Sequence, residues 1–310
     1  MKNVIKILLL TPMAFSIIGC QTKKAEAKPV DVIIISGQSN GVGCTHCSCV
    51  SRSMGNKKYQ EYMKGYDGIQ IAFDSWTKDV KADGSALFYS QNKSKDDTFV
   101  KVMFGQGNYG AAFGPEIGIA EKMNEKYGGK LFLIKYACGA SNLKDDWAKR
   151  KSPMYGRFVE YVKKQMENLK TLGYQPTIKA MCWMQGEGDS YDGYYQNYLA
   201  NTKEFVGNLR EDFKELAGNK DFPFIDAGIN NSMTVDRTAL LWQYYKEVNE
   251  AKKQFAAESE NNIYIDTIAE GLHTDQEPFD TPDPAHYDSE SQVKLGNLFA
   301  EQFEQFLSQE

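Results

Sequence analysis

Two short segments of the chain hold the residue types that nucleophilic catalysis uses. Ser39 follows an apolar run and lies in Gly37-Gln-Ser-Asn-Gly41, a GxSxG pattern that can lift a serine hydroxyl out of a tight turn after a strand. Asp283 and His286 form a DxxH pair on a proline-rich loop, where the carboxylate can hold one ring nitrogen and leave the other free for a serine proton. Serine, histidine and aspartate together predict attack of a serine on a carbonyl carbon.

The choice of histidine is narrow, because the chain has three histidines in all. A general base that works near neutral pH is most often an imidazole. His46 lies in a cysteine-rich segment, and His273 follows Gly-Leu without a carboxylate in DxxH register. His286 is therefore the candidate base.

Two further apolar runs end in turns that could supply hydrogen bonds to an oxyanion. Trp183-Met-Gln-Gly-Glu187 places the Gln185 carboxamide directly after a run of strand length. Gly139-Ala-Ser141 follows another run and offers an unhindered glycine N–H. Loss of one such donor typically lowers the rate about 10²- to 10³-fold.

Strand-length apolar runs alternate with helical patterns along most of the chain. This alternation predicts an α/β fold with a mostly parallel sheet covered by helices on both faces, so that the strand ends gather at one edge. The segment 41–110 is weakly periodic and predicts long loops and short irregular pieces. The expected strands cover 30–36, 68–73, 130–137, 177–184, 222–228 and 262–266, and the expected helices cover 158–169, 195–216, 241–255 and 295–306.

The ordered set of motifs resembles the sialate O-acetylesterase-like domain, a relative of carbohydrate esterase family six within the SGNH hydrolases. The resemblance runs from about Val30 to Phe306. It rests on Gly-Gln-Ser-Asn at 37–40, Phe-Gly-Pro-Glu at 113–116, Gly-Ala-Ser at 139–141 with Trp147 after it, Trp-Met-Gln-Gly-Glu at 183–187, and Asp283-x-x-His286.

This resemblance implies a flavodoxin-like three-layer α/β/α sandwich that removes O-acetyl groups from sugars without a metal or other cofactor. By it, Ser39 is the nucleophile, His286 is the general base and then the acid, and Asp283 orients the imidazole. The implied oxyanion hole consists of the Ser39 and Gly139 N–H groups and the Gln185 side chain. The residues implied to support the site or to bind substrate are Gln38, Asn40 and Glu187.

Three positions depart from the family pattern; they affect the expected sugar specificity and remove no residue of the triad. Met184 stands where a histidine is common, Ala140 where a second glycine is common, and Gly41 where a methionine often follows. Some aromatic residues of the expected loops could stack on a sugar, although we expect more of them to pack on the domain than to touch substrate. They are Tyr59, Tyr66, Trp76, Tyr109 and Trp147.

The N-terminus has the pattern of a secretory signal. Lys2 and Lys6 precede an apolar run, and Ile17-Ile-Gly-Cys20 resembles the lipobox of bacterial lipoproteins. We expect a signal peptide over 1–19, a lipidated Cys20 with a tether to residue 29, and an esterase domain over 30–310. The predicted protein is thus a membrane-anchored lipoprotein of the cell envelope, periplasmic or at the cell surface; ordinary cleavage at a small residue is the alternative.

The remaining cysteines allow several interpretations. Of six cysteines, removal of Cys20 leaves five (6 − 1 = 5), which cannot all pair within one chain. The cluster Cys44-Thr-His-Cys47-Ser-Cys49 is compatible with a metal site, a local disulfide or plain loop thiols, and no second ligand pair supports the metal. Cys138 and Cys182 lie in apolar runs and are expected to be buried.

Composition excludes several classes of protein. The 310 residues are 42% hydrophobic and 25% charged with a net charge of −5, which excludes a disordered chain, collagen and a multi-span membrane protein. The acidic balance argues against a nucleic-acid partner. Two alternatives to a sugar esterase remain open: a glycan-binding or inactive relative of the fold, and an SGNH lipase or thioesterase with the same triad and another pocket.

Overall fold

The computed structural model describes residues 26–308, so the predicted signal peptide and Cys20 lie outside the described residues. A mostly parallel sheet runs through the centre of the molecule, in the order β10-β9-β8-β1-β7-β3-β4, with β5 paired to β3. The strands are β1 (Lys28–Gly37), β2 (Thr45–His46), β3 (Tyr66–Val80), β4 (Ala86–Lys93), β5 (Val100–Val102), β6 (Ala112–Phe113), β7 (Leu131–Gly139), β8 (Tyr174–Met184), β9 (Phe224–Ala227) and β10 (Asn262–Ile265).

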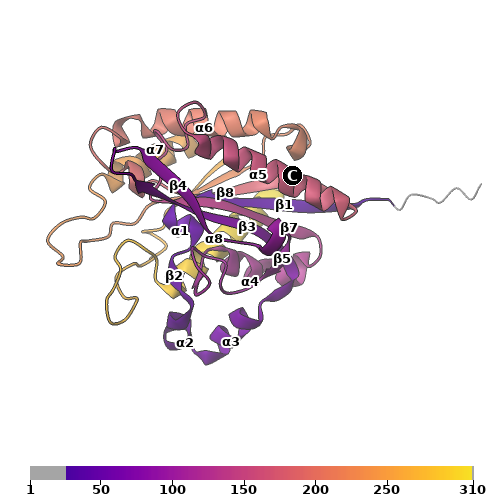
Figure 1. Cartoon of the computed structure of the whole chain (residues 1–310), viewed down its shortest axis with the longest axis horizontal. Coiled ribbons are helices and arrows are strands. Elements are labelled where there is room, and N and C mark those ends of the chain that lie inside the picture. The colour runs from indigo at the N-terminus through magenta and orange to yellow at the C-terminus, as the bar shows by residue number, and fades with distance from the viewer. Residues whose placement is uncertain (1–25, 309–310) are drawn as a thin grey trace, which may run out of the picture.

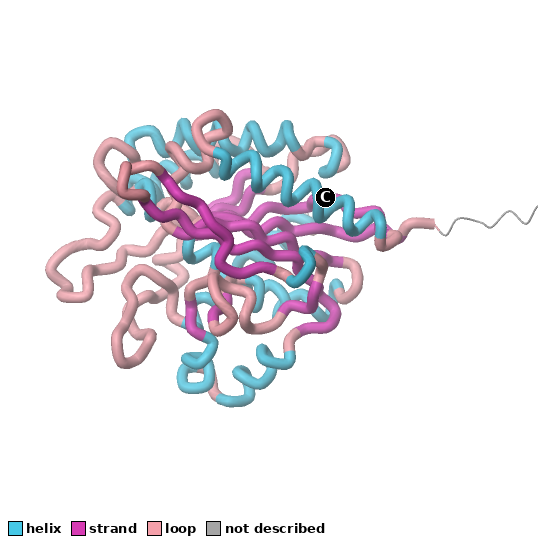
Figure 2. The backbone as a smooth tube through the Cα atoms, in the orientation of Figure 1, coloured by secondary structure: helices cyan, strands magenta, loops and turns pink. Residues whose placement is uncertain are grey.

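Helices lie on both faces of this sheet, as Figures 1 and 2 show. One face carries α5, α6 and α7, and the other carries α4 and α8, with α2 and α3 farther out. The helices are α1 (Ser39–Val42), α2 (Val50–Ser53), α3 (Asn56–Lys64), α4 (Glu116–Tyr127), α5 (Pro153–Thr171), α6 (Tyr198–Asp212), α7 (Tyr245–Ala256) and α8 (Ser289–Leu307). The predicted three-layer α/β fold is confirmed.

Local sequence explains the central elements. Every residue of β7 is buried, as a run covered by helices on both faces requires. Helix α5 begins where Ser152 caps it by accepting a hydrogen bond from the Met154 N–H at 3.2 Å, with Pro153 in the first turn. Helices α4 and α8 approach closely because Gly296 has no side chain: a Cβ there would lie 2.1 Å from the Pro115 carbonyl oxygen.

The segment 41–110 is more ordered than its weak periodicity predicts. Strand β3 pairs in parallel with β7 from Gln70 to Thr77, and from Asp74 to Val80 it also forms an antiparallel hairpin with β4. The prediction of irregular structure here is wrong because β4 is largely exposed, and an exposed edge strand needs no alternation of apolar residues.

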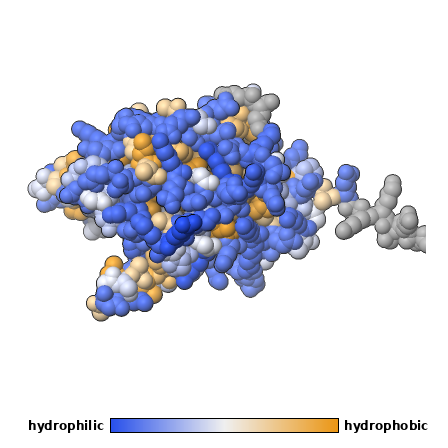
Figure 3. Space-filling model, turned by 90° about the horizontal axis from the view of Figure 1, so that it is seen from above, coloured by the Kyte–Doolittle hydropathy of each residue, from blue (hydrophilic) through white to orange (hydrophobic). Residues whose placement is uncertain are grey.

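The outer surface agrees with the composition. The face in Figure 3 is mostly hydrophilic, with smaller separate hydrophobic areas. Among the helices of residues 26–308, none has the length and apolar character needed to cross a membrane.

Candidate active site

The sheet brings the catalytic candidates to one edge. Strands β7, β1 and β8 are neighbours and run in parallel, so their carboxyl ends lie side by side. Ser39 follows β1, Gly139 ends β7, and Gln185 follows β8. The crevice beside β1 is where the chain changes the direction in which it adds strands, which is the usual ligand site of an open α/β sheet.

The turn that carries Ser39 depends on a glycine. Gly37 has φ of +136°, and a Cβ there would lie 2.0 Å from the Met184 carbonyl oxygen of β8. The next residue, Gln38, donates its N–H to the same oxygen at 2.8 Å, so β1 stays attached to β8 up to the turn. Ser39 then starts α1 and remains half-buried, with access to the site.

Asp283 and His286 form the pair that their spacing predicts. Oδ2 of Asp283 lies 2.6 Å from Nδ1 of His286, and Oδ1 accepts the Ala285 N–H at 2.9 Å. The carboxylate is thereby held on both sides and fixes the ring, which leaves Nε2 for another partner. Ser39, Gly139 and His286 all line one cavity of about 530 Å³.

The surroundings of His286 favour its charged form. Burial alone would lower the pKa of His286, but hydrogen bonding to Asp283 and the nearby Cys44 sulfur outweigh it and raise that pKa to about 10. For Asp283 burial acts in the raising direction, and the hydrogen bond to His286 together with its charge lowers the pKa of the carboxyl below its usual value. The two groups therefore stabilise each other as an ion pair.

This pKa predicts an alkaline pH profile for any reaction in which His286 acts as a base. Only the neutral imidazole accepts a proton, so kcat/KM is expected to rise about tenfold per pH unit below the pKa of His286 and to level off near pH 10. Replacement Cys44→Ala removes one raising interaction, so the midpoint should move to lower pH. The measurement is acetate release against pH, corrected for spontaneous hydrolysis; a wild-type midpoint near the ordinary histidine value of 6.5 would contradict it.

Asn40 joins the serine turn to the histidine loop. Its Nδ2 donates to Glu187 Oε1 at 2.8 Å and to the Ala285 carbonyl at 3.2 Å, and its Oδ1 accepts the Tyr287 N–H at 3.0 Å. The residues on either side of His286 are thus tied to the residue after Ser39. This single side chain sets the relative position of nucleophile and base.

Glu187 holds the Asn40 side chain in the position that joins the serine turn to the histidine loop. Its side chain is 1% exposed, and burial raises the pKa of its carboxyl. Oε1 accepts from Asn40, and Oε2 has no partner within the described residues. Glu187 lies outside the cavity lining, so in this structure it acts through Asn40.

We expect Asn40→Ala to lower kcat about 10- to 100-fold with little change in KM, because a misplacement of about 1 Å between reacting groups has an effect of this size. Glu187→Gln keeps an acceptor for Asn40 and should lose much less than Glu187→Ala. The readout is steady-state kinetics with a thermal melt for each variant. Equal losses of kcat in the two Glu187 variants would contradict a role of Glu187 as the acceptor that positions Asn40.

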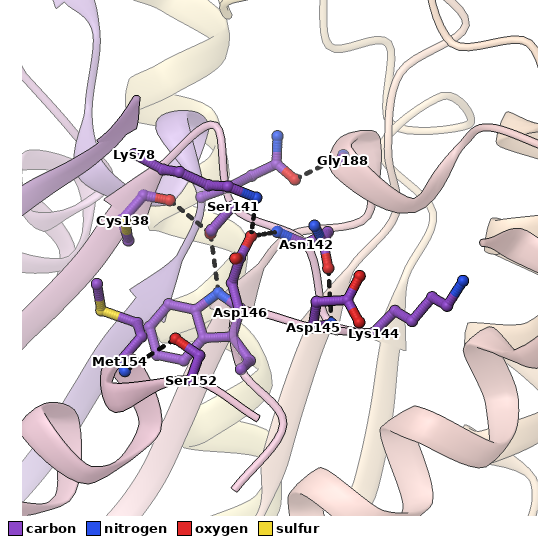
Figure 4. A network of polar contacts seen from close by, with 12 residues as sticks. Lys78, Cys138, Ser141, Asn142, Lys144, Asp145, Asp146, Ser152, Met154 and Gly188 are labelled. Carbon is purple, nitrogen blue, oxygen red and sulfur yellow. Dashed lines mark hydrogen bonds and ion pairs between the residues drawn. The ribbon is translucent and has the colours of Figure 1, made fainter. Parts of the chain in front are cut away.

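The Gly139 turn is held by the network in Figure 4. Ser141 Oγ donates to the Cys138 carbonyl at 2.6 Å and accepts the Trp147 indole N–H at 2.8 Å. Asp146 accepts the Asn142 N–H and the Lys78 ammonium, at 2.8 and 2.7 Å. These bonds fix Gly139 at the cavity wall.

Gln185 lies behind the cavity wall. Its carboxamide is fully buried, and Nε2 donates to Asp189 Oδ2 at 2.6 Å and to Gln38 Oε1 at 3.3 Å. Gln38 Oε1 also accepts the Gly188 N–H at 2.9 Å. Gln38 and Gln185 therefore connect the Ser39 turn with the loop after β8, and a direct role of Gln185 at an oxyanion stays a prediction.

Several cavity residues were not anticipated from sequence. Polar side chains come from the β3–β4 hairpin and the loop before β6, and aromatic side chains come from the loops after β8 and β9. They carry no local signal, because each is a single polar or aromatic residue, either in a loop or on a strand whose sequence has no apolar periodicity. They are Thr77, Gln91, Asn108, Tyr191 and Trp242.

The aromatic residues singled out from the sequence lie elsewhere. Trp147 and Tyr66 are buried, Trp76 packs against Tyr136, Tyr59 against Phe104, and Tyr109 against His46. Neither of the other histidines lines the Ser39 cavity. His46 contacts Tyr109 and lies beside the catalytic pair, because it lines a small pocket together with Asp283 and His286. His273 lines a separate cavity of about 430 Å³.

The described cysteines, Cys44, Cys47, Cys49, Cys138 and Cys182, are free thiols. The local disulfide interpretation is therefore wrong for this structure. Burial raises the pKa of Cys47 to about 12 and that of Cys49 to about 11, which keeps both thiols protonated. Within residues 26–308, no group of three or more His, Cys, Asp or Glu side chains is arranged to hold a metal ion.

Comparison with known families gives the class of protein to which the chain belongs. A family model described as carbohydrate esterase, sialic acid-specific acetylesterase, matches residues 29–305. The chain belongs to this family. Its members are acetylesterases, so the prediction of a carboxylic-ester hydrolase is confirmed. No curated protein matches the esterase.

Solved structures show the same fold. The esterase is similar to a protein from Arabidopsis thaliana with 22% sequence identity and a TM-score of 0.57, over 89% of this chain and 98% of that one. It is also similar to NanS with 13% identity and a TM-score of 0.58, over 92% of this chain and 99% of that one.

Proposed function

We propose that the esterase removes O-acetyl groups from sugars by a Ser39, His286 and Asp283 triad. The observation that carries this proposal is the 2.6 Å hydrogen bond between Asp283 Oδ2 and Nδ1 of His286, whose imidazole lines the same cavity as Ser39. The family to which the chain belongs supports both an acetyl ester as the bond that is cleaved and a carbohydrate as its carrier.

The reaction follows from these positions. Oγ of Ser39 attacks the acetyl carbonyl while Nε2 of His286 accepts the hydroxyl proton, and the charge on the imidazole is stabilised by Asp283. The C–O bond to the sugar breaks, and the sugar oxygen takes the proton from His286. Water then loses a proton to His286 and attacks the acetyl-enzyme, which releases acetate and restores Ser39.

The oxyanion hole in this proposal consists of the Ser39 and Gly139 N–H groups, with Gln185 as a third donor. Gly139 supports it by lining the cavity beside Ser39. For Gln185 to take part directly, its Nε2 would give up its hydrogen bond to Asp189 or to Gln38 and donate to the oxyanion instead. Otherwise its part is to hold Gln38.

A fluorophosphonate probe tests the proposal. The probe should phosphonylate Ser39, located by peptide mass spectrometry, and should abolish acetate release from acetylated xylan or O-acetylated sialic acid. Labelling at another residue with loss of activity would exclude Ser39 as the nucleophile. Labelling of Ser39 without acetate release from any sugar would place the substrate outside carbohydrates.

We further propose that Cys20 anchors the esterase to a membrane of the cell envelope. The support is the lipobox-like Ile-Ile-Gly-Cys at 17–20 and the polar segment between it and β1. With labelled palmitate, the full-length protein expressed in bacteria should be labelled and sediment with membranes, whereas Cys20→Ser should do neither. Cys44→Ser is the control that should remain labelled; a labelled Cys20→Ser protein would refute the anchor.

A further inference from the structure

The residues of the Phe113-Gly-Pro-Glu116 motif do not reach the Ser39 cavity. All four are buried, and none of them lines it. A buried carboxylate is stable only when its oxygens have partners. The partners of Glu116 therefore show what this motif holds in place.

Glu116 is paired with a buried lysine of the central sheet. Its Oε2 lies 2.8 Å from Nζ of Lys135 on β7, and neither side chain has any exposed surface. Its Oε1 accepts the Gly114 N–H at 2.8 Å, so both carboxylate oxygens are used. Burial lowers the pKa of Lys135, and the charge and hydrogen bond of Glu116 oppose this decrease. Glu116 thus stabilises Lys135 as an ammonium in the interior of the protein.

The ammonium of Lys135 has three acceptors for its three hydrogens. Besides Glu116, Nζ donates to the Val42 carbonyl at 3.0 Å and to the Gln106 carbonyl at 2.5 Å. A neutral amine has two hydrogens and could not form all three bonds. Lys135 therefore has no N–H left for a substrate, and its role must lie in the segments that it binds.

One of these segments is the turn that carries the nucleophile. Val42 is the last residue of α1, the single helical turn that Ser39 begins, and the Gly43 N–H closes this turn on the Ser39 carbonyl at 2.8 Å. One turn fixes several backbone angles for few hydrogen bonds, so it is unstable by itself. A cation beside the carbonyls at the end of a helix is favourable. Lys135 thus supplies the tertiary contact that α1 needs.

The other end of this turn is attached to the sheet. The Gln38 N–H donates to the Met184 carbonyl of β8 at 2.8 Å. A Cβ on Gly41 would lie 2.9 Å from the Ser36 carbonyl oxygen, so the turn packs directly on the end of β1. Ser39 lies between the attachment to β8 and the attachment to Lys135, and both must hold for its position to be fixed.

The same lysine relates the two backbone donors of the proposed oxyanion hole. Gly139 ends β7 four residues after Lys135, and Lys135 lies beside Ile35 on β1. The Ser39 N–H begins the turn whose last carbonyl Lys135 binds. The positions of both donors are therefore set through β7, and donors placed in advance are the ones that stabilise an oxyanion.

We infer that Lys135, held by Glu116, is a positioning residue: it holds α1 so that the hydroxyl and the N–H of Ser39 meet the acetyl carbonyl in the reactive geometry. This inference rests on the proposed function of Ser39. It assigns the Phe113-Gly-Pro-Glu116 motif to alignment of the nucleophile rather than to substrate binding.

A second buried lysine provides a matched control. Lys252 on α7 is also buried and paired with a buried carboxylate, that of Asp226, and it donates to the Ala227 carbonyl at 2.9 Å. Both of these partners belong to β9. Removal of this pair takes away a similar charge and a similar burial, and it leaves the contacts of α1 in place.

The test compares Lys135→Met/Glu116→Leu with Lys252→Met/Asp226→Leu, because a fold often tolerates replacement of both members of a buried ion pair by apolar side chains. We expect the first variant to lower kcat for p-nitrophenyl acetate about 10- to 100-fold with little change in KM. It should also lower the rate constant for phosphonylation of Ser39 by a fluorophosphonate by a similar factor. The second variant should keep both values close to those of the wild type.

The rate constant of labelling separates alignment from folding. A merely structural loss would lower the fraction of protein that is labelled and leave the rate constant unchanged, and thermal melts give the folded fraction. Wild-type kcat and labelling rate in folded Lys135→Met/Glu116→Leu would overturn the inference. An equal loss of both in Lys252→Met/Asp226→Leu would overturn it as well.

Glu116→Gln covers the case in which the first double variant does not fold. The amide keeps the size of the side chain but removes the charge that stabilises the ammonium, and a neutral amine must give up one of its three bonds. A smaller fall in kcat at unchanged KM is expected, and wild-type kcat in this variant would overturn the inference.

The two proposals fail differently. If the wild type is phosphonylated at Ser39 and Lys135→Met/Glu116→Leu reacts at the same rate, the role of Lys135 fails and the triad stands. If the wild type is not labelled at Ser39 and Ser39→Ala still releases acetate, the triad fails and the role of Lys135 fails with it.

Discussion

Ser39→Ala is expected to lower kcat for acetyl-ester hydrolysis by about 10⁴-fold or more, because the hydroxyl is the atom that forms the acetyl-enzyme and no other group can replace it. The measurement is acetate release from acetylated sugar and from p-nitrophenyl acetate. Substrate binding should change little, since the lost oxygen is small and the cavity lining stays the same.

A matched control separates chemistry from folding. Ser51, an exposed serine on α2, bonds only locally through its Oγ to the Ser48 carbonyl, so Ser51→Ala should keep full activity. Both variants should melt within a few degrees of the wild type, as small changes at exposed or half-buried serines do. Retention of more than about a tenth of the activity by Ser39→Ala would exclude it as the nucleophile.

Asp283→Asn should give the second largest effect, a loss in kcat of up to about 10⁴-fold. The amide cannot accept the Nδ1–H as a carboxylate does, so the imidazole loses both its fixed tautomer and the charge that stabilises its protonated form. Since Asp283 raises the pKa of His286, its removal should also move the midpoint of the remaining activity to lower pH.

The shift of the midpoint distinguishes an electrostatic role from a merely structural one. Asp280→Asn changes an exposed carboxyl on the same loop and should alter neither kcat nor the pH profile. If Asp283→Asn lowered activity while leaving the midpoint in place, the carboxylate would be holding the loop rather than tuning the imidazole.

The triad candidates and the main strands could be predicted from local sequence. Continuous apolar runs of strand length, such as 30–36 and 130–137, are typical of strands that are buried on both faces. Strands β1 and β7 occupy these two runs. The DxxH spacing also needs no distant contact, because Asp283 and His286 meet within a single turn of the loop.

The rest of the site depends on contacts between distant segments. Nothing near Asn108 in sequence indicates that Gly43 and Lys135 place it beside Ser39, and nothing near Gln185 indicates that Asp189 and Gln38 occupy its amide.

Residue types and spacing therefore determined which groups can react and which segments become strands, since these properties depend on neighbours within a few residues. The tertiary structure alone decided how Asn40 joins the two catalytic segments and which aromatic residues reach the cavity. The physical reason is that these outcomes follow from the close packing of loops from six strands at one sheet edge, where a single long-range hydrogen bond can direct a side chain into the cavity or away from it.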